Sequence, residues 1–364
     1  MNNSKDKARV VVAMSGGVDS SVAAALLQEQ GYQVTGVAMK IWDGETYPVK
    51  ETRHACYGPD EEEDIEDARR VARILGIDFH VFDLRQEYKQ EVLDYFYNEY
   101  LAGRTPNPCL RCNRSVKFDS MLTKTQDSGV EFDYFASGHY ARVEYSKRKH
   151  RYLLRKAKDL SKDQSYFLSF LFQEQLSHAL FPLGHYSKGE ARKISSDLGL
   201  GVEDKPDSQN FISGGYSSLV GVAQSGPILN KQGTVLGEHR GIPFYTIGQR
   251  RGLGISAKKP LYVTDIDPEK NAIIVGGKEE AYQDELVASG MNWIAVEELQ
   301  RATKVRARIR YLHDEAEATV KPLNGDRVHV KFQEPQMAIT PGQVVVFYDG
   351  DIVIGAGTIE KTVE

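Results

Sequence analysis

Short apolar runs alternate with helical patterns between Arg9 and Ser137. Arg9–Met14 reads RVVVAM, an apolar and β-branched run of the kind that buried parallel strands show. Glu62–Leu75 carries apolar residues at helical spacing along one face. Strands that alternate with helices predict an α/β fold with a doubly wound parallel sheet. The other predicted strands are Tyr32–Met39, Phe79–Asp83 and Tyr134–Ser137, and the other helices are Ser20–Gln30, which stops at Gly31, and Tyr88–Ala102.

The pattern changes along the second half of the chain. Residues 161–198 look helical, whereas short β-like runs between Gly, Pro, Asn and Asp turns follow from Gly221 onward. Such runs are typical of a small barrel or sandwich. We expect a domain at 1–220 with a helical extension, a small central domain at 221–285 and a C-terminal β-barrel at 286–364. The later predicted strands are Tyr262–Ile266, Ala272–Val275, Thr303–Tyr311, Glu317–Val320, Arg327–Phe332, Gln343–Tyr348 and Ile352–Ile359.

The composition is that of an ordinary globular protein. Of 364 residues, 41% are hydrophobic and 27% are charged, which excludes a disordered or collagenous chain. No apolar run approaches the ~20 residues of a membrane helix, and the polar start does not read as a secretory signal. We therefore expect a cytoplasmic protein with no membrane partner. The net charge of -5 does not indicate nucleic-acid binding, but an acidic protein can still carry a locally basic face.

The segment Met14–Ser21 joins the first predicted strand to the first predicted helix. Gly16 and Gly17 allow a tight turn, so that backbone N–H groups, Ser hydroxyls and the helix N-terminus can face an anion. Because a carboxylate repels phosphate, Asp19 is expected to hold Mg²⁺ or to orient the loop. The segment is not a Walker A loop. It resembles the pyrophosphate-binding loop (PP-loop) of the N-type ATP pyrophosphatases, although a plain glycine-rich turn is the alternative.

The chain has three cysteines, which is too few for a disulfide scaffold, and the number is odd. Cys109 and Cys112 form a C-x-x-C pair that follows the proline-stiffened sequence TPNP, and neighbouring arginines favour thiolates. Such a pair can face one metal or one another. A four-cysteine zinc site is impossible because only Cys56 remains, and a structural zinc site would have to recruit His54.

The stretch from Arg104 to Phe118 resembles the bacterial and mitochondrial tRNA-specific 2-thiouridylases, which carry TPNPxxxCN followed by KF. Further motifs of this family continue to the C-terminus, so the resemblance covers essentially the whole chain. They are GHYAR at 138–142, KDQSYFL at 162–168, GxH at 237–239, YTIGQRxGLG at 245–254, RY at 310–311 and PGQ at 341–343.

The resemblance implies ATP-dependent thiolation of C2 of the wobble uridine in tRNA. ATP adenylates the C2 oxygen, a cysteine persulfide delivers sulfur, and AMP departs. A uracil carbonyl is a poor electrophile, and a persulfide is a suitably soft nucleophile for the activated carbon. The base must leave the anticodon stack to react. The implied partners are tRNA and a sulfur donor, either a cysteine desulfurase or a sulfur-relay protein.

The resemblance also implies the site residues. By position, Cys112 aligns with the family's nucleophile, whereas Cys109 occupies a place that is Asp in many members. We expect Cys109 and Asp19 to share the chemistry with Cys112. Met39 and His139 also have plainer alternatives, as a core methionine and a surface histidine. The residues expected to bind ATP and Mg²⁺ are Ala13, Met14, Ser15, Gly16, Gly17, Val18, Asp19, Ser20, Met39 and Gly138. The residues expected to contact tRNA are Asn107, Pro108, Cys109, His139, Lys162, Asp163, Gln164, Arg310, Tyr311 and Gln343.

The chain departs from the family at one point. The family usually has a second cysteine in a loop reading DSxxxCFI, whereas the corresponding, shortened stretch Lys205–Ile212 has none, and no cysteine follows Cys112. Two mechanisms stay open. Either Cys109 or Cys56 replaces the missing cysteine in persulfide chemistry, or Cys56, Cys109 and Cys112 hold a [4Fe–4S] cluster with one open iron for exogenous sulfide.

Charge patterning adds two basic stretches and one acidic run. Arg142–Lys158, with interleaved tyrosines, and Arg301–Tyr311, with alternate arginines on one strand face, can each follow a phosphate backbone. Solvated strand faces are the alternative. The acidic run Asp60–Asp67 is expected to be a solvated helix face turned away from RNA.

Two rival functions remain. A related enzyme that adenylates a small molecule leaves Cys112 and the C-terminal motifs unexplained. A non-catalytic RNA-binding protein would not need the intact SGGVDS loop at 15–20. Release of AMP that depends on tRNA separates the first rival from a thiouridylase, and catalytic turnover separates the second.

Overall fold

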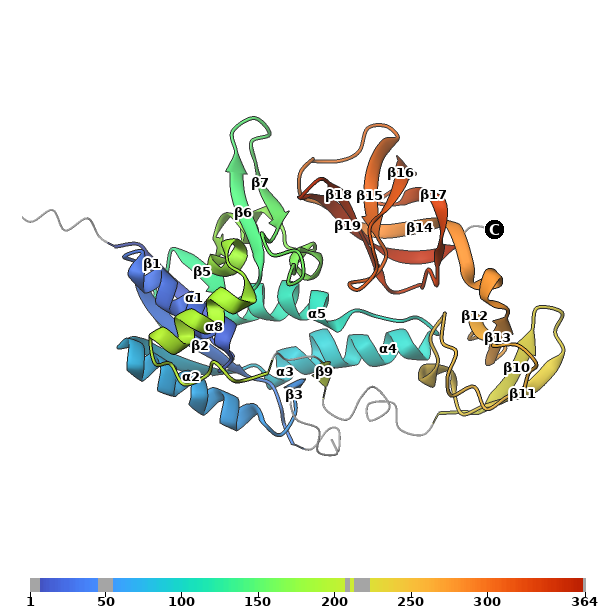
Figure 1. Cartoon of the computed structure of the whole chain (residues 1–364), viewed down its shortest axis with the longest axis horizontal. Helices are drawn as coiled ribbons and strands as arrows, with labels where there is room; N and C mark the ends of the chain where they lie inside the picture. The colour runs from blue at the N-terminus through green and yellow to red at the C-terminus, as the bar shows by residue number, and fades with distance from the viewer. Residues whose placement is uncertain (1–6, 45–54, 207–209, 213–222, 363–364) are drawn as a thin grey trace, which may run out of the picture. The chain divides into compact units, whose positions relative to one another are not determined.

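A computed structural model describes residues 7–44, 55–206, 210–212 and 223–362 (Figure 1). By contacts, the chain divides into two compact units. The first comprises Met1–Val92, Cys109–Gly215 and Asp351–Val353, and the second Leu93–Pro108, Tyr216–Gly350 and Ile354–Glu364.

The first unit is built on a parallel sheet with the strand order β4-β2-β1-β5-β8. Since β1 pairs in parallel with β2 on one side and with β5 on the other, the winding of the chain reverses between them. Ligands bind at the carboxyl ends of strands beside such a switch point. The predicted doubly wound α/β fold is therefore confirmed. The strands are β1 (Arg9–Ala13), β2 (Gln33–Lys40), β4 (Asp78–Asp83), β5 (Tyr134–Ser137) and β8 (Ala179–Leu180).

The helices of this unit follow the predicted patterns closely in its first part. α1 (Val18–Glu29) is buried along most of its length, and Gly31 beyond its end has a φ of +92°, as a helix-terminating glycine requires. α2 (Glu61–Leu75) buries the predicted apolar face. The predicted helix Tyr88–Ala102 consists of three consecutive pieces: α3 (Arg85–Tyr88), the π-helical segment η1 (Lys89–Asp94) and α4 (Tyr95–Leu101), of which α4 belongs to the second unit.

The prediction of a helical stretch over 161–198 is wrong in its middle. Helix is confined to short pieces and to α8 (Lys188–Asp197), and β8 adds a strand to the parallel sheet. Two residues are too few to show a strand pattern. The short helices are η3 (Ser165–Leu168), α7 (Gln173–Ser177) and η4 (Pro182–His185).

Two strand pairs of the first unit were not predicted. β6 (Ala141–Ser146) and β7 (Arg151–Lys156) form an antiparallel hairpin inside the first basic stretch. β3 (Ala55–Tyr57) pairs in parallel with β9 (Asn210–Ile212), so Cys56 lies beside the strand that replaces the family's cysteine-containing loop. Of the shortened stretch, residues 207–209 lie outside the described residues, as does His54.

The second unit contains the two predicted β domains. A four-stranded sheet has the order β11-β10-β13-β12, and six strands in the order β14-β17-β16-β15-β18-β19 are closed into a barrel by pairing of β14 with β19. The first sheet comprises β10 (Gly226–Asn230), β11 (Val235–His239), β12 (Tyr262–Asp267) and β13 (Ala272–Gly276). The barrel comprises β14 (Tyr282–Trp293), β15 (Thr303–Arg308), β16 (Ala316–Pro322), β17 (Val328–Met337), β18 (Val344–Asp349) and β19 (Ile352–Thr362).

No helix within the described part of the chain is long and apolar enough to span a membrane.

Candidate active site

The predicted phosphate loop folds back on itself at the carboxyl end of β1. The Ser20 hydroxyl accepts a hydrogen bond from the Ser15 backbone N–H at 3.0 Å. Gly16 has a φ of +70°, and a Cβ at this position would collide with the backbone carbonyl of Asp64 in α2, so only glycine fits here. These contacts hold the loop at the N-terminus of α1, where backbone N–H groups favour a phosphate.

Asp19 lies in the first turn of α1 and is bound from two sides. The Tyr140 hydroxyl donates a hydrogen bond to its carboxylate at 2.7 Å, and the Lys188 ammonium contacts both carboxylate oxygens at 2.8 Å. The side chain of Lys188 is only 12% exposed, so this pair is shielded from solvent more than an ordinary surface ion pair. The phosphate loop therefore carries an ordered carboxylate with a cation directly beside it.

Lys188 was not predicted from the sequence. It is the first residue of α8, directly after the N-cap Ser187, whose hydroxyl accepts a hydrogen bond from the Glu190 backbone N–H at 3.3 Å. A lysine in the first turn opposes the helix dipole. This unfavourable position is the one feature of the sequence that could have indicated that the charge of Lys188 interacts with a group outside the helix.

Gly138 follows β5 and packs against the first turn of α1. A Cβ here would lie 2.6 Å from the Ser20 nitrogen and 2.7 Å from the carbonyl carbon of Asp19. The ends of β1 and β5 thus bring most of the predicted ATP-binding residues together. Met14 is 2% exposed and offers a ligand only its backbone, whereas Met39 in β2 is partly exposed.

The three cysteines belong to the same unit and lie close enough to interact electrostatically. Cys109 is half-buried in α5 (Pro108–Arg111), Cys112 is buried at the start of the π-helical segment η2 (Cys112–Ser120), and Cys56 is exposed in β3. Burial, together with the neighbouring thiols, raises the pKa of Cys109 to about 12 and that of Cys112 to about 11. Within the described ranges, no group of three or more His, Cys, Asp or Glu side chains is placed to hold a metal ion.

Lys117 lies among these thiols, five residues after Cys112 in η2. A π-helix bonds residues five apart, which brings them close to one face. The ammonium of Lys117 opposes the rise in pKa of Cys112 and Cys109. Burial lowers the pKa of Lys117 itself, but the three thiols outweigh burial and leave it raised. The KF motif marked Lys117 in the sequence, but gave it no role.

His139 links the thiol cluster to the phosphate loop. Its Nδ1 lies 2.8 Å from the Ser137 hydroxyl. Burial, and then the charge of Lys117, lower the pKa of His139 to about 3, so the ring is neutral at physiological pH. His139 directly follows Gly138, which touches the loop. Nucleotide site and thiols therefore meet at the carboxyl end of β5.

The Lys162-Asp163-Gln164 segment shapes the backbone behind the loop. Asp163 is 3% exposed and its carboxylate accepts hydrogen bonds from the Ser165 backbone N–H at 3.1 Å and hydroxyl at 3.0 Å. The side-chain oxygen of Gln164 accepts a hydrogen bond from the Tyr140 backbone N–H at 2.9 Å. Gln164 thus positions Tyr140, Asp163 fixes the backbone at Ser165, and Lys162 and Gln164 are partly exposed.

Gln343, in the second unit, holds the segment that precedes the cysteine pair. Its side-chain amide donates to the carbonyls of Thr105 at 3.1 Å and Pro106 at 3.2 Å, and the Thr105 backbone N–H donates to the Pro341 carbonyl at 2.8 Å. The PGQ motif therefore fixes the backbone that leads to Asn107 and Pro108.

The predicted arginine row is confirmed only in part. Arg306 and Arg308 lie on one face of β15, where Val305 and Ala307 are buried on the other, whereas Arg310 lies beyond the end of the strand. The arginines have partners within the unit. Arg308 pairs with Glu315 at 3.1 Å, and Arg310 donates to the carbonyls of Met337 at 3.1 Å and Ala338 at 3.3 Å. Tyr311, which follows Arg310, is partly exposed.

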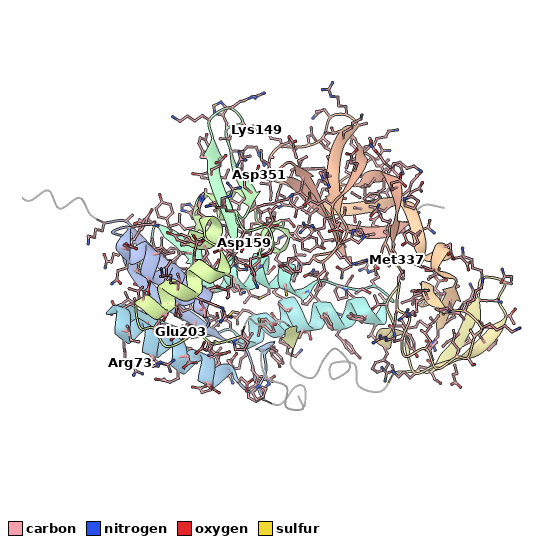
Figure 2. The ribbon with its side chains drawn as sticks, in the orientation of Figure 1. Arg73, Lys149, Asp159, Glu203, Met337 and Asp351 are labelled. Carbon is pink, nitrogen blue, oxygen red and sulfur yellow. The ribbon has the colours of Figure 1, made fainter. Side chains whose placement is uncertain are left out.

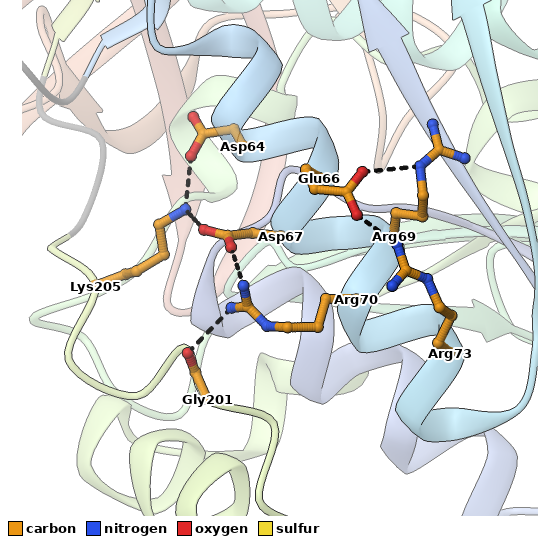
Figure 3. A network of polar contacts seen from close by, with 8 residues as sticks. All are labelled: Asp64, Glu66, Asp67, Arg69, Arg70, Arg73, Gly201 and Lys205. Carbon is orange, nitrogen blue, oxygen red and sulfur yellow. Dashed lines mark hydrogen bonds and ion pairs between the residues drawn. The ribbon is translucent and has the colours of Figure 1, made fainter.

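The prediction of a solvated helix face over 60–67 is wrong for Glu61, Asp64 and Asp67, whereas Glu62, Glu63 and Glu66 are exposed. Glu61 accepts hydrogen bonds from two backbone N–H groups after β2, at 2.7 Å and 3.0 Å. Lys205 pairs with Asp64 at 2.7 Å and also with Asp67, which is buried and pairs with Arg70 at 2.5 Å (Figure 3). The helix that contacts Gly16 is thereby tied to the chain that follows α8.

Three protein families together match most of the chain. The tRNA methyl transferase HUP domain matches residues 8–213, the tRNA methyl transferase PRC-barrel domain matches 218–277, and the Aminomethyltransferase beta-barrel domain matches 283–359. The chain is also 48% identical over 363 residues to tRNA-specific 2-thiouridylase MnmA 2 of Caldanaerobacter subterraneus subsp. tengcongensis, with 98% of each chain covered.

The chain belongs to the tRNA-specific 2-thiouridylase family. Two further relatives bear the name tRNA-specific 2-thiouridylase MnmA. The protein of Moorella thermoacetica is 49% identical, with 97% of this chain and 100% of the relative covered. The protein of Symbiobacterium thermophilum is 49% identical, with 98% of this chain and 93% of the relative covered.

Proposed function

We propose that this protein is an ATP-dependent tRNA 2-thiouridylase that replaces the C2 oxygen of the wobble uridine by sulfur. One observation carries the proposal. The phosphate loop and the thiol cluster belong to one unit and meet around Gly138 and His139. A nucleotide loop beside buried nucleophilic thiols suits adenylation followed by sulfur transfer, and the names of the relatives point to tRNA as the substrate.

The first step activates the base. The C2 oxygen of uridine attacks the α-phosphorus of ATP, and the bond to pyrophosphate breaks. The loop at Ser15–Ser20 holds the leaving pyrophosphate, and Lys188 neutralises part of its charge. The carboxylate of Asp19 suits Mg²⁺, which in proteins takes one or two carboxylates together with substrate phosphates. The metal supplies charge neutralisation at the phosphates.

The second step moves sulfur. A persulfide anion on Cys112 attacks C2, and the C2–O bond breaks to release AMP. The thiolate of Cys109 then attacks the Cys112 sulfur, which leaves the thiocarbonyl on the base and a Cys109–Cys112 disulfide. A low-molecular-weight thiol reduces this disulfide, and a sulfur donor of the cysteine desulfurase or sulfur-relay class recharges Cys112. Residues three apart on a helical turn share a face, which favours Cys109 as the second thiol.

The cluster alternative finds less support. A [4Fe–4S] site with one open iron needs three converging protein ligands, and the described residues offer no such group. We therefore assign no step to iron.

Most of the predicted tRNA-contact residues are partly exposed, among them Asn107, Lys162, Gln164, Arg310, Tyr311 and Gln343. We assign direct contact to Asn107, Lys162 and Tyr311. Asp163, Gln164, Gln343 and Arg310 act by positioning backbone, and His139 closes the site around the base.

The test of the function is an assay with unmodified tRNA transcripts that carry uridine at the wobble position. The purified protein, ATP, Mg²⁺ and a persulfide donor are expected to yield 2-thiouridine, together with AMP and pyrophosphate formed only when tRNA is present. AMP formation without any dependence on tRNA would instead favour the small-molecule adenylating rival.

Cys56 separates the persulfide and cluster mechanisms. Cys56→Ser is expected to retain at least about half of the thiolation rate, because Cys109 and Cys112 suffice for the sulfur step. Iron content and the visible spectrum of anaerobically purified protein are measured alongside. About four irons per chain in the wild type, lost together with activity in Cys56→Ser, would overturn the persulfide proposal.

Lys117→Met is expected to slow sulfur transfer without slowing adenylation. The ammonium lowers the pKa of the neighbouring thiols, so its removal raises that pKa, and each unit costs about tenfold in thiolate at neutral pH. Thiolation is expected to fall by ~10-fold or more while tRNA-dependent pyrophosphate release persists.

Because the Cys112 pKa already lies near 11, alkylation of this thiol should rise with pH throughout the range 7–9, and the variant profile should shift to higher pH. Lys117→Arg is the charge-preserving control. An unshifted alkylation profile would refute this role.

A further inference from the structure

The tip of the β6–β7 hairpin is an exposed and strongly basic part of the first unit. This tip, Lys147–Arg151, is an unbroken basic run, and Lys147, Arg148, Lys149 and His150 are all exposed. The hairpin projects from the sheet in Figure 1, and Figure 2 shows Lys149 at its end.

The charges at the base of the hairpin differ from those at the tip. Arg142 and Arg155 both pair with Asp351, at 2.6 Å and 2.7 Å, and Arg155 also pairs with Glu144 at 2.6 Å. These ion pairs stiffen the stem and neutralise the charge of its two arginines. Glu144 of the hairpin is thereby engaged by Arg155, and the exposed Lys147 and Arg148 give the tip a positive field that attracts an anionic partner.

An aromatic platform lies between stem and tip. Tyr145 and Tyr152 are cross-strand partners with ring centroids 5.1 Å apart, and Tyr145 is 49% exposed. Gln173 of α7 holds Tyr152 by hydrogen bonds of 2.9 Å to its backbone N–H and to its carbonyl. The exposed Tyr145, packed against the braced Tyr152 and beside a basic run, is suited to stack on a nucleobase while the cations contact phosphates.

We propose that this hairpin is a tRNA-binding arm that grips the RNA backbone at a distance from the reacting base. The inference rests on the proposed function, because it takes tRNA as the substrate. β6 begins three residues after Gly138, at the nucleotide site, and six strand residues at about 3.3 Å each place the tip roughly 20 Å away. The arm therefore acts on binding of the tRNA and takes no part in the chemical steps.

The test compares two matched variants that each remove two exposed positive charges. Lys147→Ala/Arg148→Ala is expected to weaken tRNA binding by about tenfold at physiological salt and to reduce the slope of log affinity against log salt by roughly 1.5. Lys258→Ala/Lys259→Ala, in an exposed stretch of the second unit, should change neither. Tyr145→Ala should weaken binding with no change in slope. For all three, the thiolation rate at saturating tRNA should match the wild type.

The outcomes are distinguishable from failure of the proposed function. If the wild type neither binds nor thiolates tRNA, the function itself fails. If the wild type does both, and the Lys147/Arg148 variant keeps its affinity and salt slope, the arm is refuted. The Lys147/Arg148 variant could instead bind tRNA normally and lose thiolation only when a donor protein supplies the sulfur. That result would refute the arm and identify the hairpin as a docking site for the donor protein.

Discussion

Cys112→Ser is expected to abolish thiolation of tRNA while tRNA-dependent release of pyrophosphate continues. A serine hydroxyl carries no persulfide and is a far weaker nucleophile toward an adenylated carbonyl. The buried position of Cys112 means that no solvent-borne thiol readily takes its place. Product formation, followed by 2-thiouridine analysis of the recovered tRNA, should fall by at least about 1000-fold.

The cysteine pair supplies the control for this variant. Cys109→Ser removes a thiol of the same C-x-x-C motif but leaves the persulfide carrier. We expect it to complete a single transfer to the covalent Cys112–tRNA adduct and then to stall, unless an added thiol releases the product. Full multiple-turnover thiolation by Cys112→Ser would place the nucleophile elsewhere.

Much of the α/β unit was predictable from local patterns. β1 is rich in apolar β-branched residues, α1 is rich in Ala and Leu, and α2 shows a clear amphipathic face. These are features of single segments, so they need no knowledge of neighbours. β8 and β3 escaped prediction because strands of two or three residues show no pattern and exist only through their pairing partners.

The hairpin shows another limit of sequence reasoning. Its stem residues alternate in a way compatible with strands, but eight lysine and arginine side chains between 142 and 158 dominate the pattern. The partner that compensates the stem, Asp351, is about 200 residues away in sequence. The local sequence therefore does not show that Arg142 and Arg155 form ion pairs while Lys147 and Arg148 are exposed.

The candidate site was only partly predictable. Motif spacing pointed to the phosphate loop and to Cys112, since both act through short local sequences. It did not reveal Lys188, which reaches Asp19 from 169 positions away, nor the place of Lys117 among three thiols. For Gln343 and Asp163, the sequence pointed to RNA contact, whereas the structure gives their polar atoms backbone partners. A motif marks that a residue is needed, but only its three-dimensional neighbours show for what.

Asp19→Ala is expected to abolish tRNA-dependent AMP and pyrophosphate formation, with tRNA affinity changed by less than about twofold. The carboxylate is the acidic group of the phosphate loop that suits Mg²⁺, and without it the charge that builds up on pyrophosphate is less well neutralised. Loss of ~4 kcal/mol of such stabilisation corresponds to about 1000-fold in rate. Asp19→Asn keeps an acceptor for the Tyr140 hydroxyl, and should be nearly as inactive if negative charge is what matters.

A double variant distinguishes the two roles that Asp19 could have. If the carboxylate only restrains Lys188, then Asp19→Ala frees an ammonium that misplaces the phosphates, and Asp19→Ala/Lys188→Met should recover much of the lost rate. If the carboxylate holds the metal, the double variant loses a phosphate contact as well and should be no faster than Asp19→Ala. We expect the second result. The two changes touch one ion pair, so their effects on rate will not add, and the sign of the deviation decides between restraint and metal binding.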